Sequence, residues 1–271
     1  MIYYIVIFFI LGTIFGSFYH VVGYRLPKGE SIVTPKYSYC PNCHKRLKPW
    51  ELIPILSYLF QGGKCKNCGS KISIFYPFIE LITGLLFAVS FYSFGFSYEL
   101  IISLVLVSLF SIVIVSDLTY MIIPDEVTLT CSIIIVAVNF LNLGLKGGLL
   151  QLGSGILTFL IMYLIMLLGN FIFKKESLGG ADIKLMFVAG LVLHPVLGIF
   201  SIFLASSIAL PASIGVYPSG IIGLFVPAFF PFIVPFSSVL VLTGTFIYSF
   251  SLPFLSTQSA RSLKCFSSFV S

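Results

Sequence analysis

Charged residues are scarce in this 271-residue chain, since Asp, Glu, Lys and Arg together make up 9% of it. Soluble domains carry about 25% charged and about 45–50% apolar residues. Here 58% of the residues are hydrophobic and the mean hydropathy is +1.10. This composition excludes a water-soluble fold and predicts an integral membrane protein.

Acidic residues are absent after Asp182, and basic residues are unevenly placed. Nine of the fifteen Lys and Arg residues lie between Arg25 and Lys71, in a polar insert of an otherwise apolar chain. The net charge of +6 does not point to nucleic acid, because basic residues beside spanning segments usually set orientation in a membrane. We expect the lipid bilayer, and no nucleic acid, as a partner.

The first segment, residues 1–22, lacks both a cationic start and a small-residue cleavage site. It is therefore interpreted as a retained membrane helix. Taking about 17–25 apolar residues as one crossing, we predict an all-α polytopic membrane protein with about eight transmembrane helices. Prolines in the last predicted spans leave seven spans or a re-entrant segment open. The predicted spans are residues 2–22, 77–96, 99–116, 127–143, 149–173, 183–202, 203–219 and 221–250.

The basic insert also sets the expected orientation. The positive-inside rule places residues 23–76 in the cytoplasm, with the N-terminus outside the inner (plasma) membrane. Four parts are then expected: the first helix (1–22), the cytoplasmic Cys-rich insert (23–76), a transmembrane domain (77–255) and a Ser-rich tail (256–271). No repeat of 20–50 residues is apparent.

Four of the six cysteines form two close pairs, Cys40 with Cys43 and Cys65 with Cys68. Two C-x-x-C turns at this spacing resemble a zinc ribbon, in which four thiolates hold a tetrahedral structural ion. A small insert gains folding free energy from such an ion. The alternatives are that the thiols merely pack as small apolar groups, and that His44 is a further ligand. Cys131 and Cys265 are interpreted as plain apolar or surface residues.

Two aspartates lie at the ends of separate predicted helices on the cytoplasmic side, Asp117 and Asp182. Each alone has a structural explanation, as a helix cap or an interfacial residue. Together, two close carboxylates share one proton, so that one activates water and the other donates to a peptide carbonyl. Asp125 and Glu126, which follow Pro124, are interpreted as first-turn acids of the next helix.

Several motifs in consistent order resemble type IV prepilin peptidases over about residues 10–210. They are Gly16-Ser17-Phe18, Arg25-Leu26-Pro27, the paired cysteine turns, Tyr76-Pro77 with Glu80-Leu81, Asp117-Leu118 with Ile123-Pro124-Asp125, and Gly179-Gly180-Ala181-Asp182-Ile183-Lys184-Leu185.

The resemblance implies a membrane aspartic endopeptidase of the GxGD class that removes the basic leader from type IV prepilins and pseudopilins. Its catalytic residues would be Asp117 and Asp182. Members with the cysteine insert also methylate the new N-terminus with S-adenosylmethionine, and Gly63 matches a glycine associated with that step. Prepilin or pseudopilin substrates are the implied partners.

The chain departs from the family pattern in three places. Ala181 replaces the second glycine of GxGD, His20 stands where Asn is usual, and the basic and Pro-Phe-Gly-Pro segments are unclear after Ile214. Three alternatives stay open: another intramembrane aspartic protease, a proton-coupled transporter that uses the acids as a relay, and a zinc-bearing assembly factor.

Overall fold

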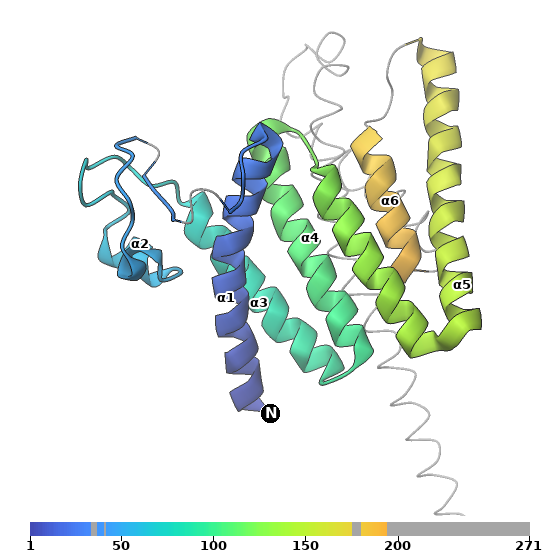
Figure 1. Ribbon diagram of the computed structural model, residues 1–271, viewed down its shortest axis with the longest axis horizontal. Helices are drawn as coiled ribbons and strands as arrows, with labels where there is room; N and C mark the ends of the chain where they lie inside the picture. Colours follow the sequence, from blue (N-terminus) through green and yellow to red (C-terminus); the bar gives the residue numbers. More distant parts are fainter. Residues whose placement is uncertain (34–36, 41, 175–179, 194–271) are drawn as a thin grey trace, which may run out of the picture. The chain divides into compact units, whose positions relative to one another are not determined.

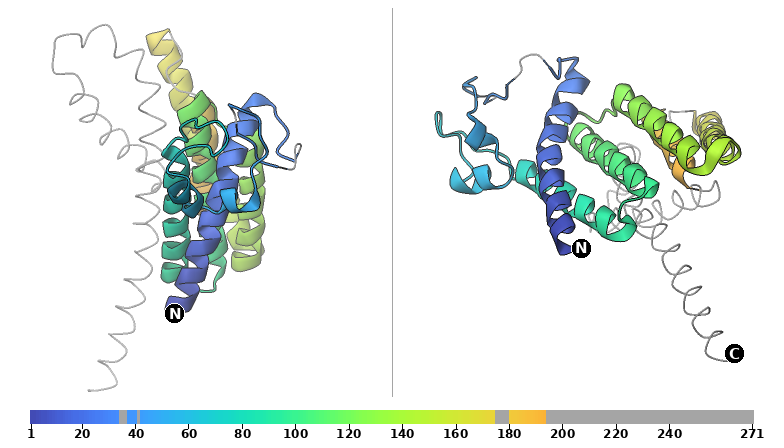
Figure 2. Two further views of the ribbon diagram at one scale, coloured as in Figure 1. Left: turned by 90° about the vertical axis from the view of Figure 1, so that its left-hand side faces the viewer. Right: turned by 60° about the horizontal axis from the view of Figure 1, so that its bottom comes forward.

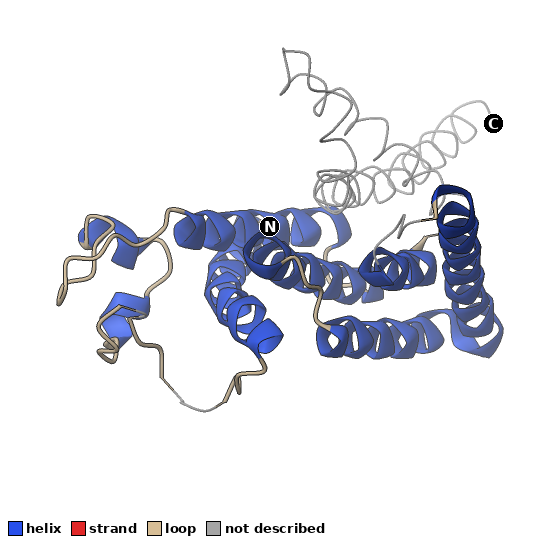
Figure 3. Ribbon diagram, turned by 90° about the horizontal axis from the view of Figure 1, so that it is seen from above, coloured by secondary structure: helices blue, strands red, loops and turns tan. Residues whose placement is uncertain are grey.

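The computed structural model describes residues 1–33, 37–40, 42–174 and 180–193, and for 173, 181 and 182 the backbone alone. Within these residues every regular element is a helix, as Figure 3 shows. The only strand-like pairing there consists of two isolated bridges in the insert. The elements are α1 (Ile2–Arg25), η1 (Leu26–Lys28), η2 (Pro49–Leu52), α2 (Leu56–Phe60), α3 (Phe75–Phe94), α4 (Tyr98–Tyr120), α5 (Asp125–Phe173) and α6 (Gly180–Val192).

Four of the described helical stretches are long and apolar enough to cross a membrane. They are Ile2–Lys28, Phe75–Phe94, Tyr98–Tyr120 and Asp125–Ile172. The prediction of an all-helical, multi-spanning protein is therefore confirmed. The predicted spans 203–219 and 221–250, and the end of 183–202, lie outside the described residues, so the count of eight stays a prediction.

Local sequence signals explain where the helices begin. The Ser97 side chain accepts a hydrogen bond from the Leu100 amide at 3.3 Å and so caps the start of α4. Pro124 precedes α5, and Asp125 and Glu126 occupy its first turn, which confirms the interpretation of these two acids. Acids are favourable there because the helix dipole is positive at its N-terminus.

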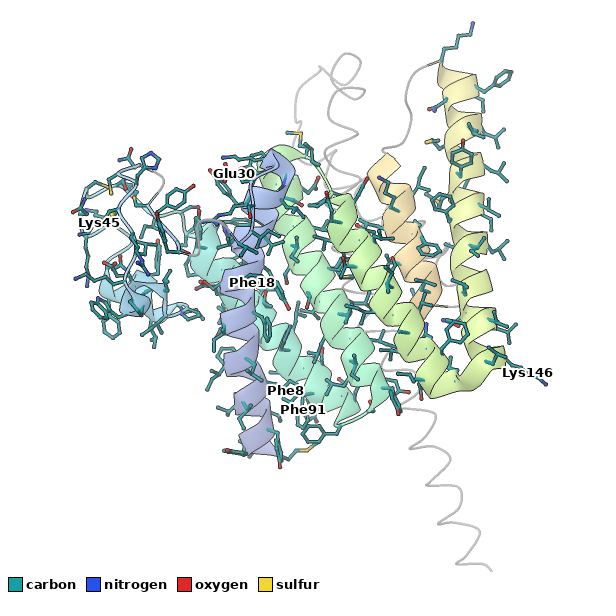
Figure 4. All side chains as sticks on the ribbon, viewed as in Figure 1. Phe8, Phe18, Glu30, Lys45, Phe91 and Lys146 are labelled. Atoms are coloured by element: carbon teal, nitrogen blue, oxygen red, sulfur yellow. The ribbon has the colours of Figure 1, made fainter. Side chains whose placement is uncertain are left out.

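The long helix α5 contains two arms separated by a break at Gly144. Its 49 residues would extend about 73 Å as one helix, more than twice the hydrocarbon thickness. Gly144 has φ 69° and ψ −175°, a conformation that only glycine adopts readily. The two arms correspond to the predicted spans 127–143 and 149–173, and Figure 4 shows Lys146 at the bend between them.

The chain divides into two compact units, Met1–Val138 and Asn139–Ser271, and each is described by itself. In the first unit α1 packs on α3 and α4 (Figures 1 and 2). Gly12 and Gly16, four residues apart on α1, allow this close contact. A Cβ at Gly12 would lie 2.8 Å from the Gly84 Cα, and one at Gly16 would lie 3.0 Å from the Glu80 Cα. Small residues at this spacing let membrane helices approach closely. Close packing is important here because lipid provides no hydrophobic driving force for helix association.

Hydroxyl groups add polar contacts between the same helices. Thr83 and Ser111 hydroxyls lie 3.0 Å apart and join α3 to α4. Ser103 donates to Ser90 at 2.6 Å between the same two helices, and the Tyr19 and Ser108 hydroxyls lie 2.6 Å apart between α1 and α4. Such side chains have no water to bond in a bilayer, so these pairs favour one register of the helices.

Aromatic rings close the end of this unit at which α1 begins. The rings of Phe8 and Phe91 stack with centroids 4.6 Å apart, and Figure 4 shows both near the start of α1. The Phe96 ring meets the Phe91 ring edge-on at 5.0 Å. The start of α1 therefore lies beside the end of α3, and the two helices are antiparallel.

In the second unit the second arm of α5 packs antiparallel to α6. The Ser154 hydroxyl of this arm donates to the Leu193 carbonyl at 3.2 Å, and the Asn139 side-chain amide, from the end of the first arm, donates to the Leu191 carbonyl at 2.8 Å. A Cβ at Gly190 would lie 2.8 Å from the Gly155 Cα, so the backbones approach closely here too. These contacts hold the helix that begins two residues before Asp182.

Replacement of Gly12 by Ala should destabilise the first unit. The added Cβ would lie 2.7 Å from the Phe87 Cβ and 2.8 Å from the Thr83 carbonyl oxygen, so α1 must move away from α3. Overpacking of this kind costs about 1–3 kcal/mol. We expect a lower thermal unfolding midpoint in detergent.

Gly153→Ala is the matched control, because a Cβ there meets nothing within 4 Å and alanine is the better helix former. Equal unfolding midpoints for Gly12→Ala and Gly153→Ala would contradict the close packing of α1 on α3.

Candidate functional site: a four-cysteine centre and two helix-end aspartates

The four insert cysteines converge on one point. The Sγ atoms of Cys40, Cys43, Cys65 and Cys68 all lie within 4.8 Å of one another, and those of Cys40 and Cys68 are 3.9 Å apart. A tetrahedral zinc ion with Zn–S bonds of about 2.3 Å requires sulfur atoms about 3.8 Å apart. The donor set and its spacing therefore fit a structural zinc ion, held by these four thiolates. This confirms the prediction of a four-cysteine cluster able to hold a metal.

The two cysteine turns repeat the same backbone hydrogen bonds. The amide after the second cysteine bonds back to the first, His44 to Cys40 at 2.8 Å and Gly69 to Cys65 at 2.9 Å. The bridges Tyr39 with Arg46 and Lys64 with Lys71 flank the two turns at equivalent positions. The two cysteine turns, which we call knuckles, are thus a local duplication. In sequence they share only the four-residue pattern C-x-N-C.

In each knuckle, an asparagine side chain also donates a hydrogen bond to a sulfur atom of the other knuckle. Asn42 donates to the Cys68 Sγ at 3.8 Å, and Asn67 donates to the Cys43 Sγ at 3.6 Å. Lys45 donates to the Asn67 Oδ1 at 3.1 Å, which turns the amide nitrogen of Asn67 toward the thiol. Donors to ligand atoms orient the ligands and tune a metal site. Sequence reasoning missed this role, although an asparagine precedes the second cysteine in both turns.

Hydrogen bonds make Cys68 a ready metal ligand. The Ser70 hydroxyl, 3.1 Å from the Cys68 Sγ, and the Ser70 amide lower the pKa of this thiol from 9.0 to about 6. A thiol with that pKa is mostly ionised at neutral pH, and the thiolate is the form that binds metal.

A buried carboxylate ties the insert to the membrane bundle. Glu80, in the second turn of α3, accepts a hydrogen bond from the Ile55 amide at 2.7 Å, and the Ser17 side chain of α1 also bonds to it. Glu80 is buried. A carboxylate is costly in a bilayer unless donors satisfy it, so this contact fixes the level of Ile55 relative to α3.

Asp117 is half-buried in the last turn of α4. The Met121 amide bonds to its carbonyl at 2.8 Å and ends the helix in a left-handed residue. Among the described residues, no group donates a hydrogen bond to the Asp117 carboxylate.

The end of α1 lies beside the last turn of α4, in which Asp117 is found. Lys28 donates to the Tyr24 hydroxyl at 3.2 Å and lies 4.3 Å from the centre of the Tyr24 ring. Its Nζ is 5.7 Å from the Tyr120 ring, which belongs to the same turn of α4 as Asp117. The chain therefore enters the insert on the side of the bundle where Asp117 lies. Sequence reasoning did not identify this Lys28 contact.

Asp182 is the third residue of α6, after Gly180 and Ala181. Its neighbours Ile183, Leu185 and Met186 are buried, so α6 is held firmly from its first turn. Asp117 and Asp182 belong to different units, and the approach of their carboxylates stays a prediction.

Gly63 has a structural reason to be glycine. It adopts φ 67°, and a Cβ there would lie 2.9 Å from the Tyr58 hydroxyl. The close approach of the chain's own tyrosine and the positive φ therefore explain why this residue is a glycine. The assignment of Gly63 to cofactor binding stays a prediction.

His20 lies inside the bundle, where the related motif usually has Asn. It is buried, and its ring stacks on the Tyr76 ring with centroids 3.7 Å apart. The aromatic contact between α1 and α3 accounts for a histidine at this position.

Two family models match the chain. Residues 10–94 match the bacterial peptidase A24 N-terminal domain, and residues 104–214 match the type IV leader peptidase family. A relative named prepilin leader peptidase/N-methyltransferase, from Bacillus subtilis, is 42% identical over 189 residues, which cover 69% of this chain and 73% of the relative. The chain belongs to the type IV leader peptidase family.

Other members with the same name are similar. The Neisseria gonorrhoeae protein is 32% identical over 236 residues, 76% of this chain and 79% of that protein. The Myxococcus xanthus protein is 39% identical over 188 residues, 68% of this chain but 55% of the longer relative. No solved structure matches the chain.

Loss of one knuckle cysteine should abolish metal binding. We expect wild-type protein to contain about one zinc per chain and Cys65→Ser to contain almost none, because structural sites use four ligands. Elemental analysis of the purified protein measures this. Cys131→Ser is the control, since Cys131 is buried in α5 away from the cluster. Full zinc content in Cys65→Ser would exclude the four-thiolate site.

Removal of a crossing asparagine should weaken the same site without abolishing it. For Asn67→Ala we expect zinc affinity, measured by competition with a chelator, to fall about 10-fold, the lower range for groups that contact metal ligands. Lys66→Ala, a change in the same turn, should leave the affinity near wild type. The same affinity in both variants would rule out the proposed contribution of the amide.

Proposed function

We propose that this chain is a membrane aspartic endopeptidase. It cleaves the basic leader from type IV prepilins and pseudopilins at the cytoplasmic face of the inner membrane, and it then methylates the new N-terminus. The observation that carries the proposal is the family membership, which covers both the helices around the insert and the segment that contains Asp117 and Asp182.

The structure supports the location of the reaction. Asp117 lies at the end of an apolar helix of span length, and the contact of Lys28 with Tyr120 brings the entrance of the basic insert to that end. Basic loops beside spans face the cytoplasm. A prepilin has an apolar helical segment in the bilayer and a cationic leader outside it, so its scissile bond lies at the same interface.

The proposed chemistry uses Asp117 and Asp182 as a pair. Two carboxylates that share one proton differ in role: the ionised one takes a proton from water, and the protonated one donates to the carbonyl oxygen of the scissile peptide. The water attacks the carbonyl carbon, and the amine leaves with a proton from the dyad. Neither a metal nor a covalent intermediate takes part in these steps.

The cysteine centre has a separate, structural role in this proposal. A zinc ion held by Cys40, Cys43, Cys65 and Cys68 would link the two knuckles and fold the insert. S-adenosylmethionine would supply the methyl group, and the geometry around Gly63 carries no step of that transfer.

Cleavage by the aspartate variants tests the proposal. We expect Asp117→Asn and Asp182→Asn each to lower the cleavage rate of a detergent-solubilised prepilin at least about 100-fold, because general acid–base catalysis contributes about 10²–10⁴-fold. The intact mass of the product reports cleavage and methylation in the same reaction.

Glu99→Gln is the matched control, since Glu99 is an acid in the first turn of the same helix as Asp117. We expect it to cleave at the wild-type rate. Continued cleavage by either aspartate variant would exclude the aspartic mechanism. Proton-coupled transport in liposomes that both variants abolish, without cleavage by the wild type, would favour the transporter.

A further inference from the structure

The short helices of the insert present large apolar side chains that the described part of the chain does not cover. No residue of η2 or α2 is buried, and these two helices contact each other. Trp50 is 59% exposed, Leu59 66% and Phe60 81%. We define the η2–α2 face by the exposed residues Trp50, Leu52, Ile53, Leu56, Leu59 and Phe60.

The Glu80 contact sets the level of this face relative to the bilayer. Helix α3 has 20 residues and extends about 30 Å, which equals the thickness of the hydrocarbon core. Glu80 lies five residues, or about 7.5 Å, from the start of α3. Since the Ile55 amide bonds directly to Glu80, the chain between η2 and α2 lies at or just inside the boundary of the hydrocarbon.

The charge around the η2–α2 face complements an anionic lipid surface. Residues 31–79 contain seven Lys or Arg residues and one acid, Glu51. Glu51 accepts a hydrogen bond from the Lys48 amide at 2.8 Å, and the Lys48 Nζ lies 5.2 Å from the Trp50 ring. Within the described part of residues 37–76, the exposed basic side chains are Lys45, Arg46, Lys48, Lys64, Lys66 and Lys71.

From these observations we propose that the η2–α2 face is a membrane-docking surface, with its apolar side chains inserted at the hydrocarbon boundary and the knuckle lysines on anionic headgroups. Tryptophan and long basic side chains favour this interface, because each has an apolar body and a polar or charged end. Apolar area and attraction to anionic lipids together hold such segments on a membrane. The cysteine centre is thereby kept flat against the bilayer, beside the end of α1.

Trp50 makes this docking measurable, because it is the one tryptophan of the chain. The full-length protein is placed in nanodiscs of phosphatidylcholine with or without phosphatidylglycerol. We expect blue-shifted Trp50 emission that is quenched by lipids brominated near the headgroup end of the chain and less by lipids brominated at its terminus. Phosphatidylglycerol should increase the quenching, and salt should reduce that increase.

Two variants test the apolar part of the surface. Phe60→Ser should reduce quenching of Trp50 by brominated lipid, whereas Phe171→Ser should not, although Phe171 on α5 is equally exposed at 83%. Equal quenching in the two variants would overturn the proposal. Circular dichroism confirms that each variant keeps its helices, and Phe60→Leu should restore wild-type quenching.

The charged part has its own test. The double variant Lys64→Gln with Lys66→Gln should lose the dependence on phosphatidylglycerol while it keeps the quenching in phosphatidylcholine. Emission typical of hydrated tryptophan, quenched by aqueous iodide and not by brominated lipid, would overturn the docking. Shielding of Trp50 that appears only when prepilin is added, in any lipid, would assign the face to protein substrate instead and would equally overturn it.

Discussion

The close approach of α1 to α3 is the contact on which the first unit depends. Gly12 and Gly16 leave room for the backbone of α3, and no larger residue fits without moving a helix. Because the insert connects these two helices, their packing brings both ends of the insert to one side of the bundle. The same packing leaves the end of α1 beside the end of α4, where Asp117 lies.

Polar contacts then hold the parts at fixed levels within an apolar medium. The Glu80 carboxylate accepts a hydrogen bond from the Ile55 amide, and pairs of hydroxyl groups connect the helices. The Lys28 ammonium group contacts tyrosine rings at the end of α1. In a bilayer an unsatisfied polar group is costly. Each such contact therefore favours one helix register over registers in which the polar groups would lack partners. The insert is thus positioned by the bundle, and its two cysteine turns bring the four thiols together.

Catalysis and metal binding have separate physical requirements in this protein. The cysteine centre needs four sulfur atoms a few ångströms apart, and short-range turns with crossing asparagines produce it within the insert. The proposed dyad needs two residues 65 positions apart, Asp117 and Asp182, to meet across two units. The first is a local property of two short repeats, whereas the second depends on how long helices assemble.

The sequence by itself determined the membrane class, the helical spans up to residue 173 and the cluster of four cysteines, because hydropathy and C-x-x-C spacing are local signals. It also identified the family from the ordered motifs. Only the tertiary structure decided that Gly12 and Gly16 are packing sites, that Glu80 binds the Ile55 amide, and that Asn42 and Asn67 cross between knuckles. These contacts join residues distant in the chain, and a linear pattern does not specify which distant groups meet when the helices pack.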